Sequence, residues 1–108
     1  SVAFSKPQAR ALVNLAYLTA AALPSGGTGT VTSRREHDMV VFEGVAEGNR
    51  ARVKPEAVAG LAGRPLEEGL PGQWIQPYWL WLTVNDAGGA LDVEAVEGRV
   101  GLTARMPN

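Results

Sequence analysis

The first quarter of the chain repeats apolar residues at three- and four-residue spacing, which predicts one helix over residues 6–23. Its buried stripe is expected to consist of Leu12, Leu15, Ala16, Thr19, Ala22 and Leu23. Ser5 and Gln8 form the pattern of a capping box, in which each side chain bonds the other residue's backbone N–H. Pro24 and the two glycines after Ser25 predict the end of the helix, because proline cannot continue it and glycine adopts left-handed backbone angles cheaply.

Shorter apolar and β-branched runs predict two hairpins, whose strands cover residues 28–34, 39–46, 90–96 and 99–106. Polar residues 35–38 form the first turn, and Glu97-Gly98 forms the second, tight turn. Between the hairpins, residues 50–54 alternate strictly between cations and small apolar side chains. This alternation predicts a further strand with three cations on one face.

A second long helix is predicted over residues 72–87, after a short helix over residues 55–61 and a loose stretch over residues 63–72. We expect it to be well buried, because one helix face cannot hold all of its large apolar residues: Trp74, Tyr78, Trp79, Leu80, Trp81 and Leu82. Pro77 should lie in or near its first turn, since proline inside a helix removes a hydrogen bond. Helices that bracket mainly antiparallel strands predict a two-layer α/β sandwich.

The composition is that of an ordinary globular protein, with 108 residues, 45% hydrophobic and 19% charged, and we expect one domain over residues 1–108. A net charge of -1 gives no reason to expect a nucleic-acid partner. No apolar stretch approaches the roughly 20 residues that a membrane helix needs, and no secretory signal is visible. The lack of cysteine fits a cytoplasmic location. The chain does not begin with Met, which suggests a piece of a longer protein.

A family resemblance is carried by residues 11–28, 49–55, 75–80 and 87–93. In these segments the sequence resembles the C-terminal domain of the alphaproteobacterial histidine phosphotransferases of the ChpT type. The resemblance implies a degenerate form of the ATP-binding fold of histidine kinases, the Bergerat or GHKL-like fold, without its nucleotide site. It also implies a helical-hairpin domain outside this chain, which carries the phosphoacceptor histidine and forms a homodimer.

In active kinases of this fold, the first long helix carries two asparagines four residues apart, and the second binds the magnesium that holds the phosphates of ATP. The first is present here as Asn14, but the second position is Leu18, and a leucine cannot ligate a cation that prefers oxygen. The resemblance therefore implies a degenerate nucleotide site that does not bind or hydrolyse ATP, with no cofactor, no metal and no catalytic residue. The simpler interpretation of Asn14 is a polar residue bonded at a helix edge.

The resemblance further implies that a phosphoryl group passes from the receiver domain of a hybrid histidine kinase to the histidine, and then to the receivers of response regulators. This chain alone would be inactive and would have no autokinase activity. Arg50, Arg52 and Lys54 are the candidate receiver-binding residues, because receivers present carboxylates around their phosphorylated aspartate. A solvated strand face is the simpler interpretation of these charges. Two alternatives remain open: a sensor-kinase ATP-binding domain with an unusual site, and a stand-alone protein-interaction domain.

Two further features have both a functional and a simpler interpretation. His37, the only histidine, superficially resembles a phosphoacceptor box together with Asp38, but strand-like residues follow it, so a solvated turn histidine is favoured. Trp74, Trp79 and Trp81 are candidates for partner hot spots, although we expect at least two of them to pack in the core.

Overall fold

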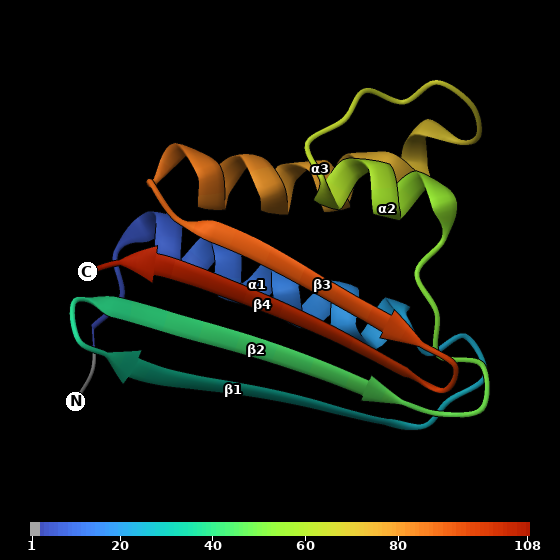
Figure 1. Cartoon of the computed structure of the whole chain (residues 1–108), viewed down its shortest axis with the longest axis horizontal. Helices are drawn as coiled ribbons and strands as arrows, with labels where there is room; N and C mark the ends of the chain where they lie inside the picture. The colour runs from blue at the N-terminus through green and yellow to red at the C-terminus, as the bar shows by residue number, and fades with distance from the viewer. Residues whose placement is uncertain (1–2) are drawn as a thin grey trace.

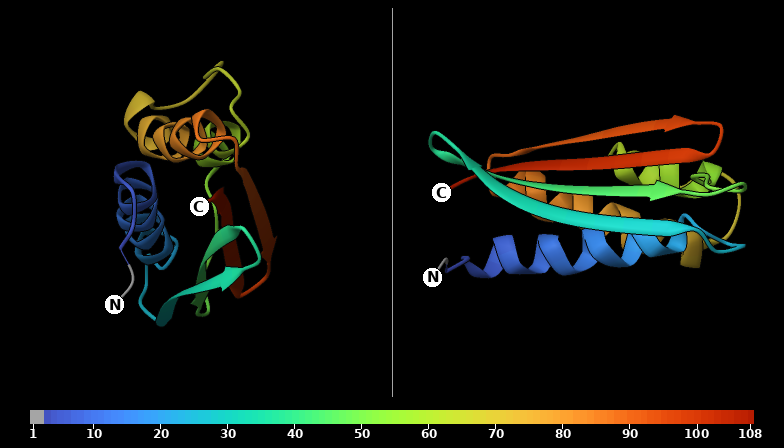
Figure 2. Two further views of the ribbon diagram at one scale, coloured as in Figure 1. Left: turned by 90° about the vertical axis from the view of Figure 1, so that its left-hand side faces the viewer. Right: turned by 90° about the horizontal axis from the view of Figure 1, so that it is seen from below.

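A computed structural model describes residues 3–108 of the chain. Its elements follow in the order α1 (Lys6–Ala21), β1 (Thr28–Glu36), β2 (Met39–Glu47), α2 (Pro55–Leu61), α3 (Pro71–Asp86), β3 (Ala90–Val96) and β4 (Arg99–Pro107). The four strands form one antiparallel sheet in the order β1-β2-β4-β3. Both long helices lie on the same side of this sheet (Figure 1 and Figure 2). The predicted two-layer α/β sandwich is therefore confirmed.

The core lies between the long helices and the inner face of the sheet. Burial alternates along β4, and its inward-facing residues Val100, Leu102, Ala104 and Met106 are buried. They form one cluster with Phe42 of β2, Leu15 of α1 and Leu80 of α3. Phe4, just before α1, adds an edge-on contact with Phe42, with ring centroids 5.3 Å apart. Residues 1 and 2 lie outside the described part of the chain.

The start of α1 is fixed by the capping box that the sequence predicts. Gln8 N donates to Ser5 Oγ at 3.2 Å, and Ser5 N donates to Gln8 Oε1 at 2.9 Å. The side chain of Gln8 is buried, and its Nε2 also donates to the carbonyl oxygen of Pro107 at 2.9 Å. One glutamine thus completes the cap and ties α1 to the end of β4.

α1 packs closely on β2 because position 44 has no side chain. A Cβ atom on Gly44 would lie 2.0 Å from Thr19 Oγ1 and 2.9 Å from Leu15 Cδ2. Thr19 Oγ1 donates to the carbonyl oxygen of Leu15 at 2.7 Å, so this buried hydroxyl is satisfied within α1. The contact between helix and sheet is therefore a backbone-to-side-chain contact that a methyl group would disrupt.

The short helix α2 packs on α3 in the same way. At Gly60 the two helices approach so closely that a Cβ atom would lie 2.7 Å from the carbonyl oxygen of Trp74 and 2.8 Å from Tyr78 N. Pro77 lies at the same crossing, since its Cβ would be 2.9 Å from a Cβ on Gly60. The backbones of α2 and α3 are thus in direct contact.

The predicted strand over residues 50–54 is wrong. Arg50 lies in the turn after β2, and residues 51–54 belong to neither a strand nor a helix. Arg52 N instead donates to the carbonyl oxygen of Ala22 at 3.0 Å, so the segment follows the end of α1. The alternation reflects one side of an extended chain facing the helical layer, where Ala51 is buried and Val53 half-buried.

The second long helix also differs from its prediction. Pro77 lies in its interior, beyond the first turn, where its ring is buried at the crossing with α2 and the carbonyl of Gln73 loses its usual helical donor. The helix is not buried all round either, because only Pro77, Leu80 and Val84 are buried, while Ile75 and Trp79 are exposed. The stripe of α1 is likewise narrower than predicted, with Leu12, Ala16 and Leu23 only half-buried.

The outer face of the sheet is mostly polar, although Val41, Val45 and Val96 also face outward. Outward-facing residues of its strands include Thr30, Thr32, Glu43, Thr103 and Glu94. Two ion pairs lie on this face, between Arg34 and Glu36 at 2.5 Å and between Arg105 and Asp92 at 3.0 Å. The sheet therefore offers solvent a polar, charged face, and β1 is exposed along its whole length.

Candidate functional site

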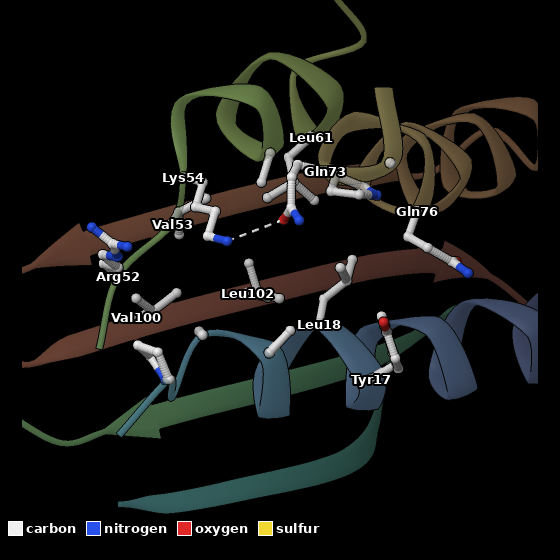
Figure 3. A pocket seen from close by; sticks show the side chains of 16 residues that line it. Tyr17, Leu18, Arg52, Val53, Lys54, Leu61, Gln73, Gln76, Val100 and Leu102 are labelled. Atoms are coloured by element: carbon white, nitrogen blue, oxygen red, sulfur yellow. Dashed lines mark hydrogen bonds between the residues drawn. The ribbon is translucent and has the colours of Figure 1, made fainter. Parts of the chain in front are cut away.

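A cavity of about 260 Å³ opens between α1, residues 52–54, α2, the N-terminal half of α3 and β4 (Figure 3). Buried and half-buried apolar side chains form its floor, among them Leu18, Val53, Leu61 and Leu102. Polar side chains surround its mouth, namely those of Tyr17, Arg52, Lys54, Gln73 and Gln76. The cavity thus combines an apolar interior with an entrance that carries two cations.

The structure brings two of the three predicted cations together at this cavity. Arg52 and Lys54 both line it and are exposed, and Lys54 Nζ donates to Gln73 Oε1 at 3.4 Å (Figure 3). Arg50 lies outside it, beside Ser25 and Asn49 at the end of the sheet, and is also exposed. Since residues 50–54 are not a strand, the three cations do not form the regular ridge that the alternation predicts.

The two positions of the expected degenerate nucleotide site lie one helical turn apart on α1. Leu18 contributes its side chain to the floor of the cavity. Asn14 lies next to it, and its Nδ2 donates to the carbonyl oxygen of Gln76 in α3 at 3.0 Å. Asn14 Oδ1 is buried without a hydrogen-bond partner among the described residues. The amide thus links two helices, as the simpler interpretation of Asn14 expects.

A groove adjoins the cavity and runs between α1 and α3, with a volume of about 690 Å³. Four large apolar side chains line it and remain exposed, at 70% for Val13, 60% for Tyr17, 40% for Ile75 and 57% for Trp79. Tyr17 and Gln76 line both the groove and the cavity, so the two hollows form one continuous surface. Of these four residues, the sequence singled out only Trp79 as a possible partner contact.

The other two tryptophans serve packing. Trp74 stacks on Tyr78 with ring centroids 4.6 Å apart, and Tyr78 stacks on Trp81 at 5.8 Å. Trp74 Nε1 also donates to the carbonyl oxygen of Arg64 at 2.8 Å, and the ring of Trp81 fills the space beside Gly63. Both indoles are half-buried against the loop that precedes α3, which leaves Trp79 as the exposed tryptophan.

Comparison with protein-family models decides the family. The model of the histidine phosphotransferase C-terminal domain matches residues 1–99. The chain belongs to this family. The match confirms the resemblance to phosphotransferases of the ChpT type, while an alphaproteobacterial origin stays a prediction. A search of curated proteins finds no match.

The phosphotransferase domain also resembles a solved bacterial phosphotransferase. The two structures superpose with a TM-score of 0.83 over 95% of this chain, at 24% sequence identity. At this level of identity the likeness shows a shared fold. The domain spans only half of the solved chain, with 50% of it covered.

His37 lies far from the cavity of the phosphotransferase domain. It occupies the two-residue turn between β1 and β2, next to the start of β2, which pairs with the end of β4. The cavity is lined by Val100, at the opposite end of β4. His37 is exposed, and its backbone φ of 56° lies in the left-handed region that suits glycine better. A solvated turn histidine remains the interpretation that fits these facts.

Glu56 fixes the loop that leads into α3. Its Oε2 accepts a hydrogen bond from Leu70 N at 3.1 Å, which joins the first turn of α2 to the residue before α3. The hydrogen bond from Leu70 N holds the pKa of Glu56 below its usual range. The backbone N–H of Glu56 itself and the positive charge of Lys54 lower this pKa further. The carboxylate therefore helps to position α3 and the entrance of the cavity.

Two classes of feature are not found within residues 3–108. No group of three or more histidine, cysteine, aspartate or glutamate side chains is arranged to hold a metal ion. No helix in this part of the chain has both the length and the apolarity to cross a membrane.

Proposed function

We propose that this phosphotransferase domain docks receiver domains, so that a phosphoryl group passes between a receiver aspartate and a histidine on a helical domain outside this chain. The receivers would be those of response regulators and of a hybrid histidine kinase. The intact protein would form a homodimer through the helical domain and act in the cytoplasm. Membership of the histidine phosphotransferase family supports a role in a phosphorelay.

The observation that carries this proposal is the charge of the cavity entrance. Arg52 and Lys54 lie there together, and none of the described residues that line the cavity is an aspartate or a glutamate. Receivers present a cluster of carboxylates around the aspartate that is phosphorylated. Opposite charges on two surfaces speed their encounter and orient the complex. Arg50 extends this positive region beyond the cavity and remains part of the proposed receiver-binding surface.

The domain would contribute position rather than chemistry. Phosphoryl transfer requires the donor, the phosphorus and the acceptor in line, and holding two reactants in such a geometry can lower the barrier by about 7–11 kcal/mol. The histidine would come from the helical domain, and the aspartate and its magnesium from the receiver. No autokinase activity and no cofactor is expected of this chain.

We also propose that the domain does not bind ATP. Leu18 offers hydrocarbon where a kinase needs a magnesium ligand, and the Asn14 amide is engaged with Gln76. A calorimetric titration with ATP in excess magnesium should give no binding heat at millimolar nucleotide. Saturable binding that depends on magnesium would support the alternative of a kinase ATP-binding domain.

The direct test of docking is a binding screen. The immobilised 108-residue chain is exposed to a panel of purified receiver domains from the source organism, and association is followed by biolayer interferometry at two salt concentrations. Binding of at least one receiver, with an association rate that falls as salt increases, is the expected result. If no receiver binds at micromolar concentrations, the proposed docking function is wrong.

A further inference from the structure

The exposed apolar residues of the domain are concentrated in the groove between α1 and α3. Among the described residues, eight large apolar side chains are exposed, and the four in this groove are Val13, Tyr17, Ile75 and Trp79. The opposite face of the domain, the outer face of the sheet, is mostly polar and has Val96 as an isolated exposed apolar residue. Exposed apolar side chains that gather in one groove with a polar rim are typical of an interaction site.

The shape of the groove favours one kind of occupant. α1 and α3 run side by side in opposite directions (Figure 1). Each contributes a row of residues four positions apart: Ala9, Val13 and Tyr17 from α1, and Ile75, Trp79 and Thr83 from α3. Two such rows form ridges with a furrow between them, which is the surface into which the ridge of a third helix packs.

The charges around the groove indicate which charge its occupant should carry. Arg10 lines the groove, and Arg52 and Lys54 line the adjoining cavity. No aspartate or glutamate is among the described residues that line either hollow. In a chain with net charge -1, the carboxylates lie elsewhere, as Glu43 and Glu94 do on the outer face of the sheet. The groove is thus an apolar furrow bordered by cations.

We propose that this groove receives an amphipathic helix of the receiver domain, with apolar residues along its contact face and carboxylates toward its ends. This inference rests on the proposed docking function and assigns the contact to residues beyond the predicted cations. The apolar side chains around Trp79 supply most of the affinity, since half-exposed tryptophans that become buried in an interface are typical hot spots. Arg10, Arg52 and Lys54 select the orientation of the incoming helix.

The first test measures affinity for a receiver that binds in the screen described above. We expect Trp79→Ala to raise the Kd by about 30-fold or more, as truncation of a hot-spot tryptophan does. Ile75→Ala should raise it by a smaller factor. Val96→Ala serves as the matched control, because Val96 is 66% exposed on β3, away from the groove. Thermal melting of each variant checks that the fold is retained.

The second test identifies the occupant directly in the intact protein. The photoreactive residue p-benzoyl-phenylalanine is placed at position 79, or at position 96 as a control, and cross-links are mapped by mass spectrometry with the receiver present. A cross-link from position 79 to a helix of the receiver is the expected result. Cross-links from position 79 only to the protein's own helical domain, or only to a second copy of the chain, would show another occupant and overturn the inference.

The two proposals can fail separately. A receiver that binds with the same Kd after Trp79→Ala overturns the helix-in-groove inference and leaves receiver docking intact. Failure of every receiver to bind the unmodified chain overturns both proposals together. A strong loss of affinity in Val96→Ala, equal to that in Trp79→Ala, would also contradict the inference, because it would place the contact on the sheet.

Discussion

Asn14 Nδ2 in α1 donates a hydrogen bond to the carbonyl oxygen of Gln76 in α3, with 3.0 Å between the two atoms. The bond crosses from one long helix to the other beside the groove. The Asn14 amide thus holds two helices together. This assigns Asn14 a structural task that does not depend on a nucleotide.

Replacement of Asn14 by alanine is expected to lower the stability of the domain without changing its affinity for ATP. Loss of one hydrogen bond at a partly exposed site should lower the free energy of unfolding by about 0.5–1.5 kcal/mol. Urea denaturation followed by circular dichroism measures this change, and Asn85→Ala, at an exposed position near the end of α3, is the control. A stability equal to that of the unmodified chain would show that the helix-to-helix bond is unimportant.

Replacement of Gly44 by alanine should be strongly destabilising. The new Cβ would meet Thr19 Oγ1 at 2.0 Å, so α1 would have to move away from β2, and overpacking of this kind costs about 1–3 kcal/mol or more. Gly101→Ala is a matched control, because this glycine is also in mid-strand and its Cβ would find its nearest atom only at 3.8 Å, in Arg99. Equal effects of the two substitutions on the melting temperature would contradict the close contact.

Charge reversal at the cavity should slow association with a receiver. For the double substitution Arg52→Glu and Lys54→Glu in the intact protein, we expect a roughly tenfold slower transfer at low ionic strength, and a smaller difference as salt increases. Arg50→Glu should have a weaker effect, because Arg50 lies outside the cavity. Arg99→Glu, on the opposite face of the sheet, is the control; transfer rates unchanged in the double variant would remove these cations from the docking surface.

The bond from Leu70 N to Glu56 should make part of the stability pH-dependent. The pKa of Glu56 is lowered in the folded chain, so its ionised form contributes stability above the unfolded pKa, and that contribution is lost as pH falls through the lower, folded value. Glu56→Gln should therefore differ most from the unmodified chain near neutral pH, and the difference should shrink in acid. Melting temperatures measured from pH 7 to pH 3 test this.

Glu67→Gln, at an exposed position in the loop between α2 and α3, is the control for that series. Hydrogen exchange of the Leu70 amide gives an independent readout, because its protection should fall in Glu56→Gln. If the melting temperatures of the Glu56 variant and the unmodified chain differ by the same amount at every pH, the carboxylate does not act through its charge.

Glycine in place of His37 should stabilise the domain. His37 has a φ of 56°, which costs a residue with a Cβ more than it costs glycine, and relief of this strain should add about 0.5–1 kcal/mol. His37→Ala is the informative control, because it removes the imidazole and keeps the strain, and it should have little effect. If alanine and glycine changed the denaturation midpoint equally, the side chain rather than the backbone would be responsible.

The sequence predicted those features of the fold whose causes are local. The capping box of Ser5 and Gln8 and the hairpin around Glu97-Gly98 depend on residues close together in the chain, and both are present. Residues 50–54 were misassigned because alternation shows only that one side of an extended chain is buried. Whether the segment pairs with a strand or follows a helix depends on contacts distant in sequence, here the bond from Arg52 N to the carbonyl oxygen of Ala22.

The candidate site was predictable only in part for a similar reason. Arg52 and Lys54 stand out because they are charged, and the structure places both at the cavity. Val13, Tyr17 and Ile75 do not stand out in the sequence, because each is an isolated apolar residue on the outer side of its helix. They become a surface only when α1 and α3 lie side by side, and the Asn14–Gln76 bond that joins these helices spans 62 positions.

The close backbone approach at Gly60 sets the spacing of the proposed docking surface. α2 begins immediately after Lys54, and α3 carries Ile75 and Trp79. The cation and the apolar residues therefore lie next to or on two helices whose backbones approach closely at Gly60, beside the ring of Pro77. Rotamer changes cannot alter the separation of these backbones. If a receiver docks here as proposed, this fixed separation would select partners: their carboxylates and apolar contacts must lie as far apart as Lys54 and Trp79 do.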